Sequence, residues 1–239
     1  MIDIHSHILP DVDDGAKSWD IALKMCAMAW QDGIEHMVAT PHANDVYHYD
    51  RPYYEELIGK LTAETGGKPA LSLGCDFHMS FENIAEALEN PAKFTIGSTP
   101  YLLVEFSNYS IPPALDESLA KLINIGLKPI ITHPERNPIL REAPQRIFDW
   151  IAAGCTVQVT ANSLTGRWGK NSEAAARSLL EANAVHFLAT DAHSLDSRPP
   201  VLSKAREVAR ELVGEEAAEM LVRGNPMAVI KGEELPKHL

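Results

Sequence analysis

The chain has 239 residues, of which 45% are hydrophobic and 23% charged, a composition typical of a globular protein with a sizeable core. Its net charge of -12 argues against nucleic acid or an anionic membrane as a general partner, but not against a phosphorylated substrate held by bound cations. No apolar run approaches the ~18 residues of a membrane span. The first residues also do not resemble a secretory signal, so we expect a cytoplasmic protein.

Short apolar strands alternate with amphipathic helical stretches along the chain. Strands are predicted at residues 1–5, 36–40, 70–75, 101–106, 128–133, 155–160 and 186–190, and helices at 18–33, 113–126, 143–154, 172–183 and within 203–232. Nearly continuous apolar runs are typical of strands buried on both faces of a parallel sheet. This α/β alternation predicts one domain over residues 1–239, built as a closed or nearly closed β/α barrel of seven strands. An open, doubly wound sheet is the alternative.

Metal-binding residue types follow nearly every predicted strand. They are His5, His7, His42, Asp76, Glu105, His133, Asn162, Asp191 and His193. In β/α barrels the functional groups lie at the C-terminal ends of the strands, so we expect these side chains to share one site. Imidazole and carboxylate together bind Zn, Mn or Fe, and such ions activate water and clamp the oxygens of a phosphoryl group.

The spacing of these residues supports a metal site. His5 and His7 are two positions apart on a strand and therefore point to the same face, and Asp191 and His193 have the same spacing. Glu105 lies inside an apolar run, where an unpaired carboxylate is costly, so a metal or a salt bridge must compensate for its burial.

The remaining histidines have simpler predicted roles. His36, His78 and His186 are interpreted as structural, His48 as a loop residue and His238 as a tail residue. Asp3 is a candidate partner that orients a ligating histidine from deeper in the barrel. The cysteines are odd in number and lack CxxC spacing, which favours buried packing over a disulfide or a zinc site. They are Cys26, Cys75 and Cys155.

Several motifs together carry a family resemblance. They are "IDIHSHILPDVDDGA", "GCDFH", "LLVEF", "ITHPER" and "ATDAHSLDSRPP", which run from residue 2 to residue 200. The pattern resembles the polymerase-and-histidinol-phosphatase (PHP) family. It is most similar to the manganese-dependent protein-tyrosine phosphatases of bacterial capsule and exopolysaccharide systems.

The resemblance implies a distorted seven-stranded, TIM-like barrel with three divalent ions at the C-terminal ends of its strands, manganese in the first place and iron or zinc as alternatives. By this analogy, His5, His7 and Asp191 hold one ion, which Asp76 bridges to a second ion bound by Glu105 and His133. Asp14, in preference to Asp13, joins His42 and His193 at the third ion. The family usually has Glu where this chain has Asp76, and the shorter side chain changes the bridging distance.

Two arginines directly follow ligand motifs: Arg136 in "HPER" and Arg198 in "DAHSLDSR". The planar fork of a guanidinium group matches the oxygens of a phosphate, so we predict that both arginines bind the substrate phosphate. The alternative for each is a surface salt bridge.

The expected reaction is hydrolysis of phosphotyrosine by metal-activated hydroxide, on a protein that the resemblance identifies as a bacterial tyrosine kinase controlling capsule or exopolysaccharide synthesis. The cysteine-dependent mechanism requires an arginine six positions after the cysteine. Asp32, Phe81 and Ala161 occupy those positions, which excludes it.

Three alternatives remain open at this level. A small-molecule phosphatase of the histidinol-phosphatase type would share the same metal site. A PHP phosphodiesterase or nuclease is disfavoured by the acidic charge and the lack of basic, aromatic-interleaved segments. A non-catalytic regulatory barrel is disfavoured by the near-complete ligand set. The sequence does not indicate an oligomeric state.

Overall fold

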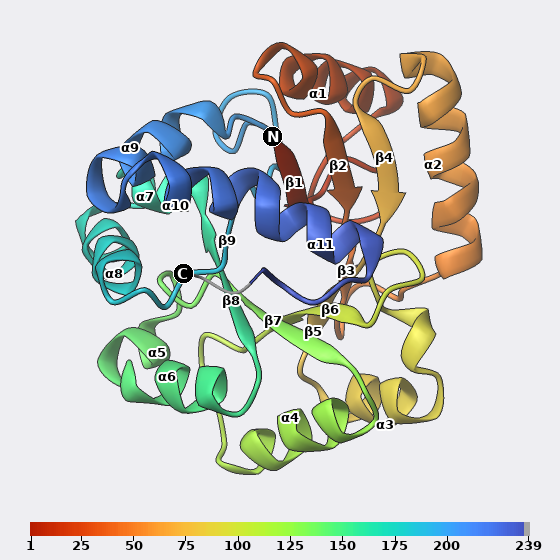
Figure 1. Cartoon of the computed structure of the whole chain (residues 1–239). Coiled ribbons are helices and arrows are strands. Elements are labelled where there is room, and N and C mark those ends of the chain that lie inside the picture. The colour runs from red at the N-terminus through yellow and green to blue at the C-terminus, as the bar shows by residue number, and fades with distance from the viewer. Residues whose placement is uncertain (237–239) are drawn as a thin grey trace.

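The computed structural model describes residues 1–236, in which parallel strands occupy the centre and helices surround them (Figure 1). The strands are β1 Ile2–Ser6, β2 His36–Ala39, β3 His42–Ala43, β4 Ala70–Leu73, β5 Asp76–His78, β6 Tyr101–Glu105, β7 Lys128–Thr132, β8 Thr156–Thr160 and β9 Phe187–Ala189. Every predicted strand has a counterpart among them, and β3 and β5 are additional short strands.

The helices follow the strands in sequence. They are α1 Trp19–Gln31, α2 Arg51–Thr65, α3 Phe81–Glu89, α4 Ala114–Asn124, α5 Pro138–Glu142, α6 Gln145–Ala152, α7 Ala161–Leu164, α8 Lys170–Glu181, α9 Ser203–Val213, α10 Glu215–Glu219 and α11 Asn225–Lys231, with a 3-10 turn η1 at Pro91–Lys93 and a π-helical turn η2 at Met220–Gly224. α1 illustrates why the predicted helices form. The Ser18 hydroxyl accepts a hydrogen bond from the Ile21 amide at its start, and Gly33 follows its end with a left-handed φ of 89°.

The strands form two parallel sheets, with the orders β1-β2-β4 and β3-β5-β6-β7-β8-β9. The predicted α/β fold with parallel strands is confirmed, but the described residues do not form one closed seven-stranded sheet. The break lies at Pro41, which has no backbone N–H to offer a neighbouring strand. Pairing crosses the break through two bonds: the Gly74 amide donates to the Ala39 carbonyl at 2.8 Å, and the Asp76 amide to the Pro41 carbonyl at 3.2 Å.

The other edges of the two sheets also meet, at the end of β9. The Asp191 amide donates to the His5 carbonyl at 2.8 Å, and the His7 amide donates to the Ala192 carbonyl at 2.8 Å. A single parallel bridge between Ser6 and Ala192 accompanies these bonds. The segments that follow β1 and β9 are therefore held side by side.

Two apolar clusters support the strands. The larger one joins the strands to the surrounding helices. The smaller one, here called the α11 cluster, contains Ile2, Ile4, Val38, Ile96, Tyr101, Leu103, Ile130, Phe187, Ala189 and Val229, the last of these from α11. Figure 1 shows α11 lying across the strands. All three cysteines are buried and free, as predicted.

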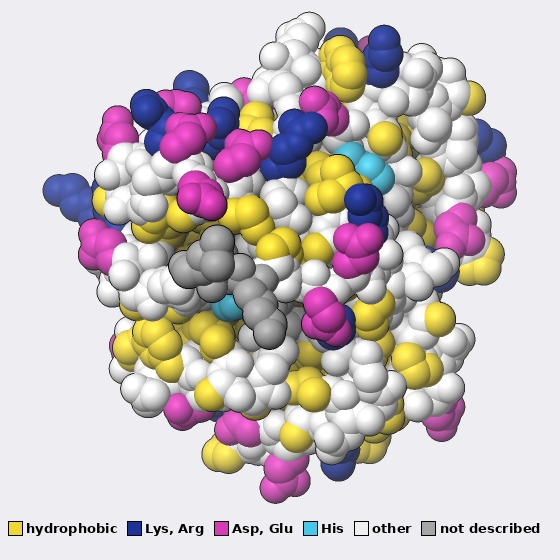
Figure 2. Space-filling view, in the orientation of Figure 1, with side chains coloured by type: hydrophobic (Ala, Val, Ile, Leu, Met, Phe, Trp, Pro, Cys, Tyr) yellow, Lys and Arg dark blue, Asp and Glu magenta, His cyan; other side chains and the backbone are white. Residues whose placement is uncertain are grey.

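The surface in Figure 2 carries acidic and basic side chains close to one another, most densely over α9 and α10. Arg206 pairs there with Glu215 at 2.7 Å and with Glu219 at 3.1 Å. Exposed pairs of this kind contribute little stability and define no site. Among residues 1–236, no helix has the length and apolar character needed to cross a bilayer.

Candidate metal and phosphate site

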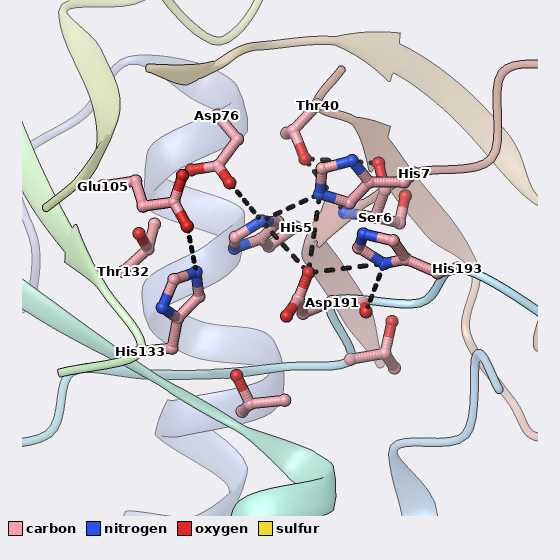
Figure 3. A network of polar contacts seen from close by, with 12 residues as sticks. His5, Ser6, His7, Thr40, Asp76, Glu105, Thr132, His133, Asp191 and His193 are labelled. Atoms are coloured by element: carbon pink, nitrogen blue, oxygen red, sulfur yellow. Dashed lines mark hydrogen bonds and ion pairs between the residues drawn. The ribbon is translucent and has the colours of Figure 1, made fainter. Parts of the chain in front are cut away.

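The predicted ligand residues converge at the C-terminal ends of the strands, as Figure 3 shows for most of them. A pocket of about 840 Å³ opens there, within the size range of small-molecule sites. Its lining includes Asp14, His42, Asp76, Glu105, His133, Arg136, Asp191, His193 and Arg198. His5 and His7 are fully buried and contact lining residues from β1 and the turn after it.

The first group of facing atoms is formed by His5, His7, Asp76 and Asp191. The Nε2 atoms of His5 and His7 are 3.3 Å apart. Asp191 Oδ1 lies 3.5 Å from each of these nitrogens, and Asp76 Oδ2 lies 3.5 Å from His5 Nε2. Four lone-pair-bearing atoms, two from the end of β1 and one each from β5 and the turn after β9, thus face one another closely.

This arrangement fits a cation better than it fits hydrogen bonding. Ligands about 2.1 Å from a tetrahedral ion are spaced about 3.4 Å apart, close to the observed separations. The Asp76 side chain is only 1% exposed, yet neither carboxylate oxygen has a hydrogen-bond partner. A buried carboxylate without hydrogen bonds is costly, and a bound cation would compensate for that cost.

Two more groups adjoin the first. His42 Nδ1 lies 3.2 Å from Asp76 Oδ2 and 3.9 Å from Glu105 Oε2, while His133 Nε2 lies 3.7 Å from Glu105 Oε1. On its other side, His42 Nε2 lies 3.3 Å from Asp14 Oδ1. His42 therefore stands between two groups, whereas the resemblance assigned it only to the set with Asp14 and His193.

The two adjacent aspartates that follow β1 have different surroundings. Asp13 is buried, and its Oδ2 lies 2.7 Å from His7 Nδ1 and accepts the His42 amide at 3.2 Å. Asp14 is half-exposed, and its Oδ1 lies 3.2 Å from His193 Nε2. Asp13 is thus placed to orient the His7 ring, and Asp14 is placed to meet an ion.

Gly15 makes this turn possible through close packing. A Cβ atom at this position would lie 2.1 Å from the His7 carbonyl oxygen, a distance that no side chain tolerates. The approach lets the Ala16 amide donate to the same carbonyl at 3.0 Å, which folds the segment back over β1.

His5 is oriented by a residue that the sequence analysis did not select. His5 Nδ1 lies 3.0 Å from Gln158 Oε1, on β8. Asp3 was the predicted partner of a ligating histidine, and it contacts the backbone of His5, not its ring. Its carboxylate is buried but accepts the backbone amides of Thr190 at 3.0 Å and of His5 at 3.3 Å, because it lies below the rings.

Two site residues have strained backbones. His133, directly after β7, has φ 36°, and Asp191, just after β9, has φ 51°. Left-handed φ values are uncommon outside glycine and cluster at functional sites, where surrounding structure maintains them. The backbone of the Asp191 turn is held by the bond from its amide to His5.

Electrostatics favour the protonation states that bind cations. Burial disfavours the ionised form of Asp191, but Arg136, Arg198 and His5 outweigh it and hold the pKa of this carboxyl well below its usual range. Burial also lowers the pKa of His133 well below 6.5, and that of His193 to about 4. At neutral pH the carboxylate is therefore charged and these two imidazoles are neutral, as metal ligands must be.

The pKa values of His5 and His42 shift in the opposite direction, because carboxylates surround both rings. Burial lowers the pKa of His5, but Asp76 and Asp191 outweigh it and raise the pKa to about 9. For His42 the nearby carboxylates of Asp14 and Asp76 outweigh burial and raise the pKa to about 11. Protons on these rings thus neutralise a concentration of negative charge that cations would otherwise balance.

Both predicted phosphate-binding arginines reach this site. Arg136 Nη1 lies 2.6 Å and Arg198 Nη2 2.5 Å from Asp191 Oδ2, so neither forms the surface salt bridge considered above. Trp168, which the sequence analysis missed, lies against both guanidinium groups. The only sequence signal for Trp168 was an aromatic residue between two glycines in "GRWG", a weak pattern.

The other candidate residues lie at or beyond the edge of the site. His36 bonds Ser72 at 2.9 Å, and the ring of His186 accepts the Val157 amide at 3.2 Å, as expected of structural residues. His78 Nδ1 lies 3.6 Å from Glu105 Oε2, nearer the site than predicted. His48 lies in the loop before α2, Asn162 lies in α7 outside the pocket lining, and His238 falls outside the described residues.

The fold and these side chains define an α/β protein with a candidate metal site at its strand ends. The family described as "Capsular polysaccharide synthesis, CpsB/CapC" matches residues 1–231, so the chain belongs to that family. The resemblance inferred from the motifs is thereby confirmed.

Curated relatives cover most of the chain. It is 34% identical over 212 residues to a putative tyrosine-protein phosphatase CapC of Staphylococcus aureus, covering 85% of this chain and 81% of the relative. It is 31% identical to the tyrosine-protein phosphatase YwqE of Bacillus subtilis, covering 92% and 88% of the two chains.

Solved structures agree with this placement. One of them is a crystal structure from work on YwqE of Bacillus subtilis and CpsB of Streptococcus pneumoniae, which are described as unique metal-dependent tyrosine phosphatases. The chain superposes on it with a TM-score of 0.92 and 30% identity, covering 100% of this chain and 97% of the other. A histidinol phosphate phosphatase of Lactococcus lactis superposes with a TM-score of 0.62 at 16% identity, covering 92% and 94% of the two chains, which shows a shared fold alone.

Proposed function

We propose that the chain is a metal-dependent tyrosine-protein phosphatase whose substrate is phosphotyrosine in a protein, most specifically a bacterial tyrosine kinase that controls capsule or exopolysaccharide synthesis. One observation carries the proposal. The buried carboxylate of Asp76, which has no hydrogen-bond partner, lies among imidazoles and carboxylates in a pocket that also contains two arginines. The names of the relatives support the phosphotyrosine substrate.

The proposed ligand sets follow the resemblance and the groups of facing atoms. By the resemblance, His5, His7 and Asp191 would hold a first ion, Glu105 and His133 a second with Asp76 between them, and Asp14, His42 and His193 a third, with manganese preferred and iron or zinc as alternatives. The facing atoms support these sets through three overlapping groups, namely His7, Asp14, His42 and His193; His5, His7 and Asp76; and His42, Asp76 and Glu105. Such ions, when bound, lower the pKa of water toward neutrality and neutralise phosphate oxygens. Asp76 is shorter than the usual glutamate, and its carboxylate lies near both His5 and His42.

The remaining groups bind and orient. Arg136 and Arg198 bind the non-bridging oxygens of the phosphoryl group, since a guanidinium fork suits phosphate and both forks already point at one carboxylate oxygen. Asp13 and Gln158 fix the rings of His7 and His5, which keeps their Nε2 atoms aimed at the shared volume.

The proposed architecture goes beyond the two sheets and joins them in one domain. We infer that residues 1–239 act as one cytoplasmic metallophosphatase domain, and that the two sheets are parts of one distorted seven-stranded barrel. The bonds of Asp191 and Ala192 to the β1 segment support this reading, since they link the two outer edges.

A phosphatase panel tests the proposal. Protein stripped of metal and reloaded with Mn²⁺ is expected to hydrolyse p-nitrophenyl phosphate and phosphotyrosine peptides, and chelation is expected to abolish both activities. Phosphoserine peptides, histidinol phosphate and bis(p-nitrophenyl) phosphate complete the panel. Faster turnover of histidinol phosphate than of any phosphotyrosine peptide would overturn the protein-phosphatase assignment, and diesterase activity would favour a phosphodiesterase. Inactivity with every metal would favour a regulatory barrel.

A further inference from the structure

The segment between α7 and α8 presents a tryptophan at the mouth of the pocket. Gly166 and Gly169 flank it with left-handed φ values of 80° and 86°. The Asn162 carbonyl accepts the amides of Arg167 at 2.8 Å and of Trp168 at 3.3 Å, so α7 holds the segment in place. Trp168 lines the pocket, and 41% of its surface is exposed although it belongs to a fixed turn.

Trp168 lies directly against the proposed phosphate-binding groups. The Cζ atoms of Arg136 and Arg198 lie 4.5 and 5.4 Å from its ring centroid. Arg136 Nη1 lies 2.6 Å from Asp191 Oδ2, whereas the buried Arg198 Nε has no hydrogen-bonded acceptor, so the Arg198 guanidinium retains a donor for phosphate oxygens. A phosphate bound there would stand within reach of the indole ring.

The rest of the pocket lining offers little to an aromatic substrate. Among the described lining residues, Trp168 is the only phenylalanine, tyrosine or tryptophan, and most of the others are charged or polar. The phenyl ring of a phosphotyrosine is apolar and rigid, and it extends directly from the phosphate. Aromatic rings in contact contribute about 0.5–1.5 kcal/mol beyond area burial, or roughly 2- to 13-fold in affinity.

We propose that Trp168 is a specificity-determining residue that contacts the phenyl ring of phosphotyrosine while Arg136 and Arg198 bind its phosphate. The inference rests on the proposed function and names the residue that would distinguish aryl from alkyl phosphate esters at that site.

A pair of non-hydrolysable ligands isolates the ring contact. Phenylphosphonate and methylphosphonate carry the same anionic group but only one has an aromatic ring, and inorganic phosphate is a second ring-free ligand. Dissociation constants would be measured by calorimetry on the Mn²⁺-loaded protein. Trp168→Ala is expected to weaken phenylphosphonate binding about 10-fold and to leave the two ring-free ligands within about 2-fold.

Two further substitutions test the chemistry of the contact. Trp168→Phe keeps an aromatic face and is expected to restore phenylphosphonate affinity to within about 3-fold of the wild type. Trp168→Leu keeps apolar bulk and is expected to remain closer to Trp168→Ala. Trp30→Ala is the matched control, because Trp30 on α1 is 42% exposed and its ring also contacts a cation, Lys68 Nζ at 5.5 Å.

Kinetics and fluorescence provide independent measurements. A contact made equally in the ground and transition states raises KM for a phosphotyrosine peptide and leaves kcat nearly unchanged in Trp168→Ala. Phenylphosphonate is expected to change the tryptophan fluorescence of the wild type and of Trp30→Ala, but not that of Trp168→Phe.

The inference and the proposed function fail in different ways. A wild-type protein without phosphatase activity on any ester defeats the proposed function. An active wild type in which Trp168→Ala weakens all three ligands equally, or weakens none, overturns the inference, since equal losses mean that Trp168 only positions the arginines. A Trp168→Phe variant as weak as Trp168→Ala would also overturn it.

Discussion

β6 connects two regions of the molecule with opposite properties. Tyr101 and Leu103 belong to the α11 cluster, while Glu105 lies in the candidate site. Successive side chains of a strand alternate between faces, so these three residues share one face. The same strand is therefore packed by apolar side chains along most of its length and carries a carboxylate at its C-terminal end.

The two regions also differ in backbone strain and in whether their buried groups lack hydrogen bonds. The α11 cluster consists of buried apolar residues. The site contains the carboxylate of Asp76, which has no hydrogen-bond partner, and the left-handed backbones of His133 and Asp191. Strain and unsatisfied polar groups in the site lower the stability of the fold, and the apolar packing of the cluster offsets that loss. Substitutions in the two regions should therefore separate activity from folding.

The largest effect is expected from removing a proposed metal ligand. His133→Ala should reduce kcat for p-nitrophenyl phosphate about 100-fold or more, because metal-assisted stabilisation is worth several kcal/mol. The free energy of unfolding of the metal-free protein should change by no more than about 1 kcal/mol. His36→Ala is the control, since His36 bonds Ser72 away from the site and its loss should leave kcat within about 2-fold. Normal activity in His133→Ala would remove this residue from the site.

A matched pair of substitutions on β6 should separate the two regions most sharply. Leu103→Ala leaves a cavity in the α11 cluster and should lower the unfolding free energy by about 2–5 kcal/mol in a urea titration. Its folded fraction should keep near-normal kcat with Mn²⁺. Glu105→Gln should show the reverse, with low activity and little change in the unfolding of metal-free protein. If both variants lost stability equally, the distinction between the regions would be wrong.

An intermediate effect is expected at the turn after β1. Gly15→Ala would place a Cβ 2.1 Å from the His7 carbonyl oxygen, so the turn must shift. Overpacking of this kind costs about 1–3 kcal/mol, and the shift should also lower activity because Asp13 and Asp14 belong to the turn. Gly59→Ala in α2 meets no atom within 4 Å and should be neutral or stabilising in the same thermal-unfolding assay. Equal behaviour of the two variants would contradict this account.

The smallest effect is expected from cysteine modification. Burial raises the pKa of Cys26 and Cys155 to about 12 and that of Cys75 well above 9, so almost no thiolate exists at pH 7.5. Iodoacetamide should leave the phosphatase activity of the folded protein unchanged, while mass spectrometry should detect alkylation of all three cysteines after denaturation. Inactivation in proportion to labelling would point to a cysteine-dependent reaction.

The sequence was most informative where chemistry follows strand position. His5, Asp76, Glu105 and Asp191 could be selected because each lies at or just beyond the end of a predicted strand, and the C-terminal ends of parallel strands meet at one edge. Their convergence therefore required only the strand assignments and the expectation of parallel packing.

Features that depend on register or on turns were not predictable in the same way. Gln158 contacts the ring of His5 from another strand, whereas Asp3, which is closer in sequence, bonds only the His5 backbone amide. Trp168 reaches the site through a turn whose path is set by the helix before it. Each of these contacts depends on which residues lie close together in the folded chain, and the spacing of residues along the sequence says little about that.

The carboxylate of Asp191 has its two oxygens committed to different partners. Oδ1 lies near the imidazoles of His5 and His7, and Oδ2 binds Arg136 and Arg198. A cation beside Oδ1 and an anion beside the arginines would therefore compete or cooperate through one buried charge. Thermodynamic linkage requires such coupling to be reciprocal, so any effect of the cation on the affinity for the anion must appear equally as an effect of the anion on the affinity for the cation.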